Sequence, residues 1–294
     1  MAQPMTRSDR ESLYGVLDAY LEALVDKHPA RLPLAKGARF SENSVELDIG
    51  DGLWNTINRR GDYDLRFADP LTGNVGWFGV VYEHDNPAAI GLRIKVEDGL
   101  ITEVESVLAR REGDAPFPNP SPEGLKDKPI LNEIVPPDQR VPRTRMRSIA
   151  NGYFSTLELN DGTLFTAIDP ACNRVENGVQ TTNNPSVRPG EPLYTLGCIE
   201  QFKTGNYRYD DELRARRFPL IDEERGLVLA GAFIDHSGRL GEVRWTDGRV
   251  RKSPYRTPHS FCVLELFKIV GGRICQVEAV FSTVTYHIPT PWAD

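Results

Sequence analysis

The sequence contains two similar halves, and this internal duplication limits the fold more than any other feature. Residues 95–105 (KVEDGLITEVE) align with residues 268–278 (KIVGGRICQVE), with Lys, Val or Ile, Gly, Ile, Val and Glu in one register. Ordered matches whose spacing drifts are typical of a duplicated domain, because loops accept insertions more readily than helices and strands do. A repeat of this size predicts two globular units rather than a solenoid.

Shorter matches continue upstream of these blocks in the same order. They pair Tyr20 with Tyr153, Arg39 and the following Glu42 and Asn43 with Arg174, Glu176 and Asn177, residues 61–63 with residues 205–207, and Asp69 with Asp222. The separation between partners grows along the chain, so the second half is expected to have the longer loops.

Each half begins with a segment whose apolar residues recur at helical spacing. These segments are residues 9–26, with Ser8 placed as an N-cap, and residues 144–159. Alternating segments typical of strands follow at residues 45–49, 63–67, 77–82, 89–96 and 101–108, and then at residues 207–209, 227–235, 261–270 and 274–284. A helix followed by mostly antiparallel strands predicts an α+β fold in which a curved sheet wraps a helix.

A proline-rich stretch, residues 113–142, separates the halves. Proline cannot occupy a helix interior or a central strand without removing a backbone hydrogen bond. This stretch is therefore predicted to be a stiff connector along the surface. The predicted domains are residues 1–112, mainly structural, and residues 143–294, with the catalytic pocket.

Composition narrows the class of protein. The chain of 294 residues is 39% apolar and carries a net charge of −7, which argues against nucleic acid as a partner. No apolar run approaches the roughly 18 residues of a membrane span, and the amino terminus has no apolar signal core, so a cytoplasmic location is expected. The four cysteines form no CxxC pair and are expected to be reduced, small apolar residues.

Common cofactor and catalytic motifs are absent from the sequence. It has no GxGxxG, P-loop, GxSxG or HExxH pattern, and its five histidines are scattered without ligand spacing. We therefore expect no cofactor and no dedicated metal site. The reaction type that these absences leave open is acid–base catalysis, which needs only a shaped pocket.

The two Lys-hydrophobic-x-x-Gly-x-Ile-x-x-Val-Glu blocks, with their preceding helices, resemble the nuclear-transport-factor-2-like superfamily. Its enzymes include SnoaL-like cyclases, scytalone dehydratase and limonene epoxide hydrolase, and a cofactor-free lyase of lignin-derived diarylpropanes belongs to it. The resemblance implies two tandem cone-shaped domains, each a curved, mostly antiparallel sheet wrapped around helices. It also implies an apolar pocket between the concave sheet and the helices.

Two histidines of the second half are candidates for proton transfer. His259 shares a strand face with Phe261, Val263 and Glu265 by alternation, which would place a base and an orienting acid against an apolar wall. The alternative is a hydrogen-bonded histidine after a proline. His236 is the next candidate, with a turn role as its alternative.

Carboxylates and tyrosines supply the other candidates. Glu105 and Glu278 each share a face with an Ile of their hairpin, where burial would raise the pKa of the carboxyl. They could instead pair with Arg39 and Arg174 to hold each cone together. Tyr hydroxyls in an apolar pocket could polarise a carbonyl or donate a proton, although core packing is the alternative. The tyrosine candidates are Tyr153, Tyr194, Tyr207 and Tyr209, the last two on one face of a predicted short strand.

These features together predict a cofactor-independent lyase, dehydratase or isomerase that uses general acid–base catalysis. The expected substrate is a hydrophobic, oxygenated, aromatic small molecule such as a lignin-derived dimer. Catalysis is assigned to His259, His236, Tyr207 and Glu265, and substrate binding to Tyr153, Tyr194, Phe261, Arg174 and Glu278. The alternative is a non-catalytic small-molecule-binding or interaction protein on the same scaffold. No membrane or nucleic-acid partner is expected, and homo-oligomerisation is left open.

Overall fold

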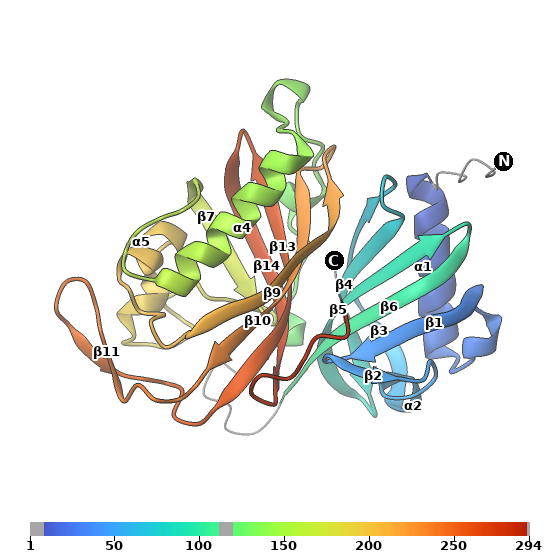
Figure 1. Cartoon of the computed structure of the whole chain (residues 1–294), viewed down its shortest axis with the longest axis horizontal. Helices are drawn as coiled ribbons and strands as arrows, with labels where there is room; N and C mark the ends of the chain where they lie inside the picture. Colours follow the sequence, from blue (N-terminus) through green and yellow to red (C-terminus); the bar gives the residue numbers. More distant parts are fainter. Residues whose placement is uncertain (1–8, 112–119, 293–294) are drawn as a thin grey trace.

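The structure is a computed structural model that describes residues 9–111 and 120–292. It contains two six-stranded mixed sheets that lie side by side, each with a long helix on its outer side (Figure 1). The predicted α+β class is thereby confirmed. The predicted Ser8 cap and residues 113–119 of the connector lie outside the described residues, and the domain boundaries stay predictions.

The first sheet follows the helix α1 (Arg10–Val25), which is capped by Asp9 accepting a hydrogen bond from the Ser12 amide at 2.7 Å. Its strands are β1 (Leu34–Glu42), β2 (Val45–Leu47), β3 (Ile57–Asp69), β4 (Asn74–Glu83), β5 (Asn86–Glu97) and β6 (Leu100–Arg110), and a short helix α2 (Leu53–Thr56) precedes β3. The spatial order is β2-β1-β6-β5-β4-β3, in which only β1 and β6 are parallel neighbours. Helix α1 packs on β3 and β4.

The second sheet repeats this topology behind the helix α4 (Arg143–Leu159). Its strands are β7 (Ile168–Glu176), β8 (Val179–Gln180), β9 (Glu212–Asp222), β10 (Leu227–His236), β13 (His259–Val270) and β14 (Arg273–Val284). The order β8-β7-β14-β13-β10-β9 matches the first sheet strand for strand. The additions are the helix α5 (Cys198–Lys203), which packs on β7, and a small hairpin of β11 (Glu242–Arg244) and β12 (Val250–Lys252).

Two asparagines fix the correspondence between the halves. Asn43 and Asn177 both adopt a positive φ at the first hairpin of their sheet. The Asn43 amide donates to the Ser106 carbonyl, and the Asn177 amide donates to the Ala279 carbonyl, both at 2.9 Å. Ser106 and Ala279 therefore occupy equivalent places, as the sequence repeat predicted for their strands.

The sheets pack back to back through an apolar layer formed by the faces that point away from the helices. Strand β14 lies against β5 and β6, while β9 lies against β3 and β4. The layer holds large buried side chains from both sheets, including Phe67, Phe78, Phe233, Leu264 and Leu266. Each sheet turns its other face toward its own helix and forms a separate core there. Each Å² of apolar surface that this contact removes from water contributes about 25 cal/mol to the free energy of folding. The contact therefore stabilises the arrangement of the two sheets.

Glu105 and Glu278 lie in this layer between the sheets, so the prediction that each shares a face with the Ile of its hairpin is wrong. The register of each final hairpin shifts beside Thr102 and Cys275, where a β-bulge adds one residue. A one-residue shift exchanges the two faces of a strand, and alternation counted from the preceding Ile therefore fails.

Ion pairs neutralise Glu105 inside the layer. Its Oε2 accepts from Arg93 Nε at 3.0 Å and from Arg217 Nη1 at 2.8 Å. Both guanidinium groups lower the pKa of the Glu105 carboxyl against the raising effect of burial, which is the largest single influence. The expected structural pairing exists, but the partners are not those predicted from the sequence.

The connector takes part in the same layer. It forms the short helical turns η2 (Pro122–Gly124), α3 (Pro129–Asn132) and η3 (Pro137–Gln139), each with a proline in its first turn. Leu125 and Leu131 are buried between the sheets. Most of the other described connector residues are exposed, so the segment follows the surface and these buried side chains anchor it to the layer.

Two smaller expectations can be compared directly. The predicted strand at residues 207–209 is a turn that follows α5. All four cysteines are free thiols, as predicted, and the sulfurs of Cys172 and Cys198 lie 3.0 Å apart.

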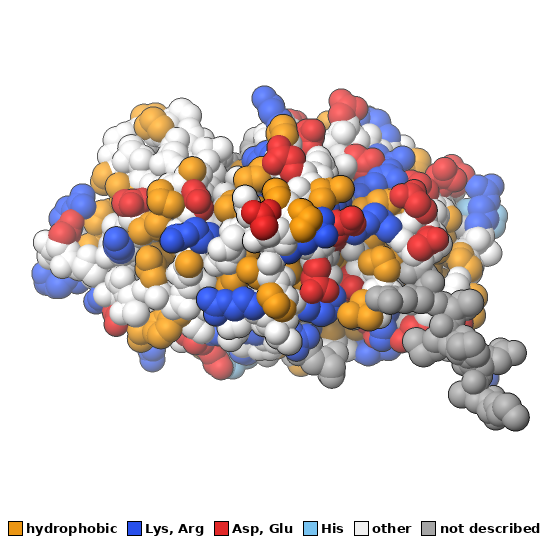
Figure 2. Space-filling view, turned by 90° about the horizontal axis from the view of Figure 1, so that it is seen from above, with side chains coloured by type: hydrophobic (Ala, Val, Ile, Leu, Met, Phe, Trp, Pro, Cys, Tyr) orange, Lys and Arg blue, Asp and Glu red, His pale blue; other side chains and the backbone are white. Residues whose placement is uncertain are grey.

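No described helix has the length and apolar character to cross a membrane. Basic and acidic side chains are interspersed over the face shown in Figure 2.

Glu105→Gln should lower the free energy of unfolding by about 3 kcal/mol or more, because two buried guanidinium groups would then face a neutral amide. Urea unfolding measures this change. The matched control is Glu97→Gln at the exposed end of β5, expected to change stability by less than about 0.5 kcal/mol. Equal effects of the two substitutions would contradict the assigned role of Glu105.

Candidate functional site

A small cavity lies between the concave face of the second sheet and α4. It encloses about 50 Å³. Its walls are Tyr153, Leu157, Arg174, Glu176, Tyr207, Tyr209, Asp210, Ile234, Tyr255, Phe261, Val263, Glu265, Ala279 and Phe281. We call this space the inner cavity. Charged groups and tyrosine hydroxyls thus face a largely apolar enclosure, which is the usual composition of a small-molecule site.

Glu265 is the most perturbed carboxyl of the inner cavity. It stands on β13 between Val263 and Phe267 on the same face and is 4% exposed. Burial raises the pKa of Glu265 to about 8, and the nearby Glu176 carboxylate adds to the rise. The Arg174 charge and a hydrogen bond from Tyr153 oppose it. A carboxyl with this pKa exchanges its proton near neutral pH.

Arg174 enters the cavity from β7 and organises its polar side. Its Nη2 contacts Gln201 and donates to the Tyr207 hydroxyl at 2.5 Å, while its Nη1 lies 3.5 Å from the Tyr153 hydroxyl. Tyr207 in turn donates to Gln201 at 2.7 Å. Arg174 Nε has no hydrogen-bond partner among the described residues. The guanidinium therefore sets two tyrosine hydroxyls in place and keeps one donor unused.

Asp210 lines the inner cavity and pairs with the buried His236, which is not itself one of the lining residues. His236 Nε2 lies 2.8 Å from Asp210 Oδ1, and both side chains are almost fully buried. Burial raises the pKa of Asp210, and the bond to His236 partly opposes the rise. The His236 ring packs 4.3 Å from that of Tyr255, and its Nδ1 has no partner among the described residues. The predicted turn role of His236 does not describe this buried pair.

His259 is half-buried and is not one of the residues lining the inner cavity. Its Nδ1 lies 2.8 Å from the Thr257 carbonyl, and its ring stacks on His236 with centroids 4.6 Å apart. Burial lowers the pKa of His259. The alternation of β13 places Phe261 and Glu265 in the cavity as predicted. His259 instead stacks on His236 outside the lining of the cavity. Its catalytic role stays a prediction.

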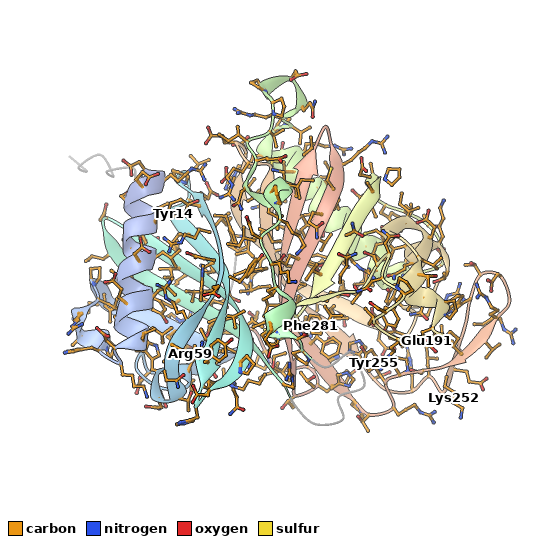
Figure 3. The ribbon with its side chains drawn as sticks, turned by 180° about the vertical axis from the view of Figure 1, so that it is seen from behind. Tyr14, Arg59, Glu191, Lys252, Tyr255 and Phe281 are labelled. Atoms are coloured by element: carbon orange, nitrogen blue, oxygen red, sulfur yellow. The ribbon has the colours of Figure 1, made fainter. Side chains whose placement is uncertain are left out.

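A larger space adjoins the inner cavity on its outer side. This outer chamber encloses about 230 Å³ and shares Glu176, Tyr207, Tyr209 and Tyr255 with the inner cavity. Tyr194, predicted to bind substrate, lines the outer chamber only. In Figure 3 Tyr255 lies between Phe281 and Lys252, which marks the direction from the inner cavity to the chamber.

Glu278 does not reach either space. Its Oε1 contacts the Tyr63 hydroxyl of the first half, and its Oε2 lies 3.6 Å from Lys128 Nζ. Burial raises the pKa of Glu278. Glu278 thus forms a contact between the two sheets and the connector, and its substrate-binding role stays a prediction.

The first half has apolar residues where the second half has the charges of the cavity. Leu92 pairs with Ser106 in the first sheet, and Glu265 pairs with the equivalent Ala279 in the second. Leu92 thus occupies the position of Glu265. It is fully buried in the core beneath α1.

The same comparison applies to the arginine. Phe40 lies three residues before Asn43, and Arg174 lies three residues before Asn177. Phe40 is buried in the first core, whereas Arg39, which the sequence alignment matched with Arg174, is exposed and pairs with Glu46 at 2.9 Å. The predicted match of the two arginines is therefore wrong by one residue.

Several residues of the site escaped sequence reasoning. Asp210 and Tyr255 lie in the long loops of the second half, where no periodic pattern exists. Glu176 was visible as part of the repeated Glu-Asn pair, yet its position was not assigned to the site. Only the side chains on β13 followed from alternation.

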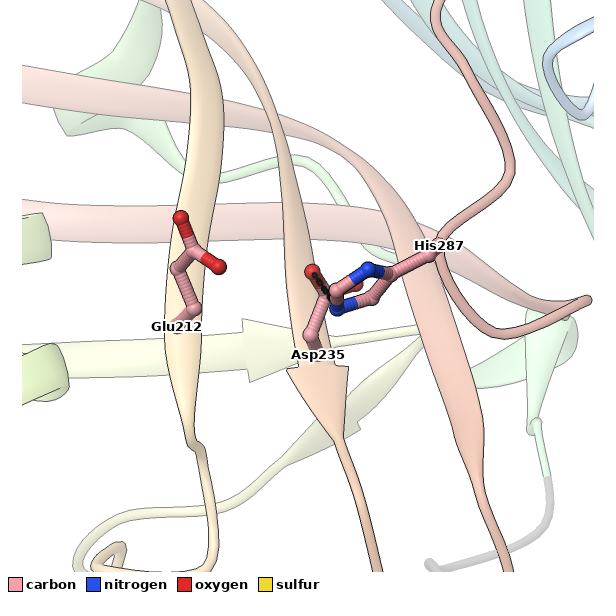
Figure 4. Close-up of side chains that lie close together, drawn as sticks. All are labelled: Glu212, Asp235 and His287. Carbon is pink, nitrogen blue, oxygen red and sulfur yellow. Dashed lines mark ion pairs between the residues drawn. The ribbon is translucent and has the colours of Figure 1, made fainter.

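Glu212, Asp235 and His287 form a group of potential metal ligands on the described part of the chain (Figure 4). Asp235 Oδ2 accepts from Arg214 Nε at 2.6 Å and lies 3.4 Å from His287 Nε2, while its Oδ1 contacts Ser260. Because a guanidinium already occupies the shared oxygen, we assign this group to an ion-pair network.

The comparisons with known proteins each match only part of the chain. Residues 139–281 match the model of a family described as a domain of unknown function (DUF8021). No curated protein matches the chain. A de novo designed protein with a curved β-sheet is 13% identical, with a TM-score of 0.29, over 34% of this chain and 88% of that chain. A protein from Kribbella flavida DSM 17836, provisionally assigned as a ketosteroid isomerase, is 16% identical, with a TM-score of 0.27, over 40% of this chain and 90% of that chain.

Glu265→Gln should stabilise the protein increasingly as pH rises from about 5 to about 8. In this window the unfolded state releases the Glu265 proton above its ordinary pKa of 4.5, while the folded state retains it up to about 8. The parent protein therefore loses about 1.4 kcal/mol per pH unit that the glutamine variant does not lose. Calorimetric melting temperatures at pH 5, 6, 7 and 8 test this.

The control for this series is Glu242→Gln on the exposed face of β11. Its difference in melting temperature from the parent protein should stay constant with pH. A difference that is equally flat for Glu265→Gln would show that the carboxyl is not held protonated.

Proposed function

We propose that the protein is a cofactor-independent lyase, dehydratase or isomerase that transfers protons on a small, oxygenated, ring-containing molecule in the inner cavity. One observation carries the proposal. Glu265 and Arg174 are buried in the second cone at positions that the first cone fills with Leu92 and Phe40. The duplicated fold is therefore built without these charges in one of its two copies.

Burial of these charges has an energetic cost that packing alone does not explain. Desolvation of an ion in a protein interior costs several kcal/mol even after relaxation, and replacement by apolar residues is often neutral or stabilising. The first cone shows which apolar residues fit the same positions. A carboxyl with a strongly shifted pKa inside a cavity is a typical sign of a catalytic group.

The proposed mechanism gives Glu265 the proton transfer. Its pKa of about 8 means that both protonation states are accessible near neutral pH, so one carboxyl can take a proton from carbon and return it elsewhere. Negative charge that develops on a substrate oxygen would be stabilised by Arg174 and by the hydroxyls of Tyr153 and Tyr207. In a dehydration, the Glu265 carboxylate would take the proton from carbon and return it to the departing hydroxyl, which leaves as water.

The enclosure favours an enzyme over the alternative of a simple binding protein. General acid–base catalysis needs a titratable group next to a partner that orients it, inside a site that excludes water. Glu265 and Tyr153 form such an arrangement in the inner cavity, and Asp210, which also lines it, is oriented by His236 from outside the cavity. A binding protein has no need for either pair to be buried.

The size of the site favours a single-ring substrate. Pockets for drug-sized ligands usually measure about 300–1,000 Å³. The inner cavity of about 50 Å³ and the outer chamber of about 230 Å³ lie at or below the lower end of this range. We therefore propose a molecule smaller than the lignin-derived dimer that the sequence resemblance implied.

A thermal-shift screen of single-ring phenols, enones and hydroxyketones, followed by product analysis of each hit, should identify a substrate. With that substrate, Glu265→Gln should lower kcat by about 10²-fold or more, because the amide cannot transfer a proton. Tyr207→Phe should lower kcat less, since Arg174 still faces the developing charge.

Two variants make this test decisive. His259→Ala tests the competing prediction from the sequence, which assigns proton transfer to His259. If Glu265 is the proton-transfer group, this variant should keep kcat within a factor of about ten of the parent protein. Glu242→Gln controls for loss of a surface charge. Near-normal turnover by a folded Glu265→Gln variant would refute the proposal.

A further inference from the structure

The outer chamber is basic at the end away from Glu265. Its lining includes Arg188 from the loop before α5 and Arg251 and Lys252 from β12. Three cations thus meet around one space in a chain whose net charge is −7. The one carboxylate in the lining, Glu176, lies at the opposite end, because it is shared with the inner cavity.

The basic side chains repel one another across the chamber. Burial lowers the pKa of Arg251, and the charge of Arg188 lowers it further. Glu191 contacts Arg251. Arg251 also lies over the Trp245 ring, 5.3 Å from its centroid, which limits how far the guanidinium can move away. An anion in the chamber would be attracted by the three basic side chains that line it.

Aromatic walls connect this basic end to the inner cavity. Tyr207, Tyr209 and Tyr255 line both spaces, and the rings of Tyr209 and Tyr255 meet edge to face at 5.0 Å. A flat ring can pack between such side chains. Figure 3 shows Glu191 and Lys252 on the outer side of Tyr255, near the β11–β12 hairpin.

We propose that the substrate of this site is a ring-containing carboxylate, held with its carboxylate among Arg188, Arg251 and Lys252 and its ring against the shared tyrosines. Its reacting end then points toward Glu265. The proposal rests on the proposed function for the direction of the ligand, but the recognition of the carboxylate can be tested by binding alone. Arginine suits this group because its planar fork can donate two parallel hydrogen bonds to a carboxylate.

The test measures binding by isothermal titration calorimetry with three matched probes: 4-hydroxybenzoate, 4-hydroxybenzamide and phenyl phosphate. The parent protein should bind the benzoate about tenfold more tightly than the benzamide, which corresponds to one charge-assisted hydrogen bond. This preference should fall as salt is raised, because the chamber is open to solvent.

Substitutions locate the anion. Arg188→Gln and Lys252→Gln should each reduce the preference for benzoate, and the double variant should bring it close to one. Arg249→Gln is the matched control, because Arg249 lies on the same hairpin, pairs with Asp247 and does not line the chamber. Circular dichroism and the melting temperature of the unliganded variants show whether they fold.

Each outcome decides between defined alternatives. Equal binding of benzoate and benzamide, or no binding of any probe, would overturn the carboxylate inference, and so would tighter binding of phenyl phosphate. A benzoate preference that persists in the double variant would also overturn it. Glu265→Gln should retain the preference, so a failure of carboxylate recognition remains distinguishable from a failure of proton transfer.

Discussion

The apolar layer between the two sheets is the contact on which the rest of the molecule depends. It buries the face of each sheet that points away from its helix. The two concave faces therefore point away from each other, each toward its own helix. The strand β13 illustrates the consequence. Leu264 and Leu266 are fixed in the layer, and the intervening Glu265 must therefore face the inner cavity. The floor of the cavity is thus held by packing on its reverse side.

Charge inside this layer adds specificity to the apolar contact. Glu105 joins Arg93 of its own sheet and Arg217 of the other, so the correct alignment of the sheets is the one that pairs these groups. A buried ion pair stabilises little in net terms, but any alignment that separates its members leaves a charge buried alone. The same logic applies to Glu278 with Lys128, which ties the connector to the second sheet.

The sequence predicted the elements with strong periodicity and failed where the geometry departs from it. The helices α1 and α4 and the long hairpins of both halves were predicted because their apolar spacing is regular. The bulges at Thr102 and Cys275 leave no mark in the residue pattern, so the faces of Glu105 and Glu278 were reversed. Strand β9 was missed because its first residues, Glu212 to Arg217, are mostly polar. The pairing of Asp210 with His236 joins two loop-proximal residues that only the folded chain brings together.

The divergence of the two cones explains why the two ends of the site differ in charge. In the first cone, Phe40 and Leu92 fill the positions of Arg174 and Glu265 and leave a packed apolar core. The second cone keeps its charges apart. A carboxyl that stays protonated at neutral pH lies at the closed end, and permanently charged guanidinium groups stand at the open end, where water reduces the cost of their burial. A ligand with one anionic group meets Arg188, Arg251 and Lys252 in the outer chamber, whereas in the inner cavity it meets Arg174 together with Glu265 and Glu176. The distribution of charge therefore favours an orientation with the anionic group in the outer chamber.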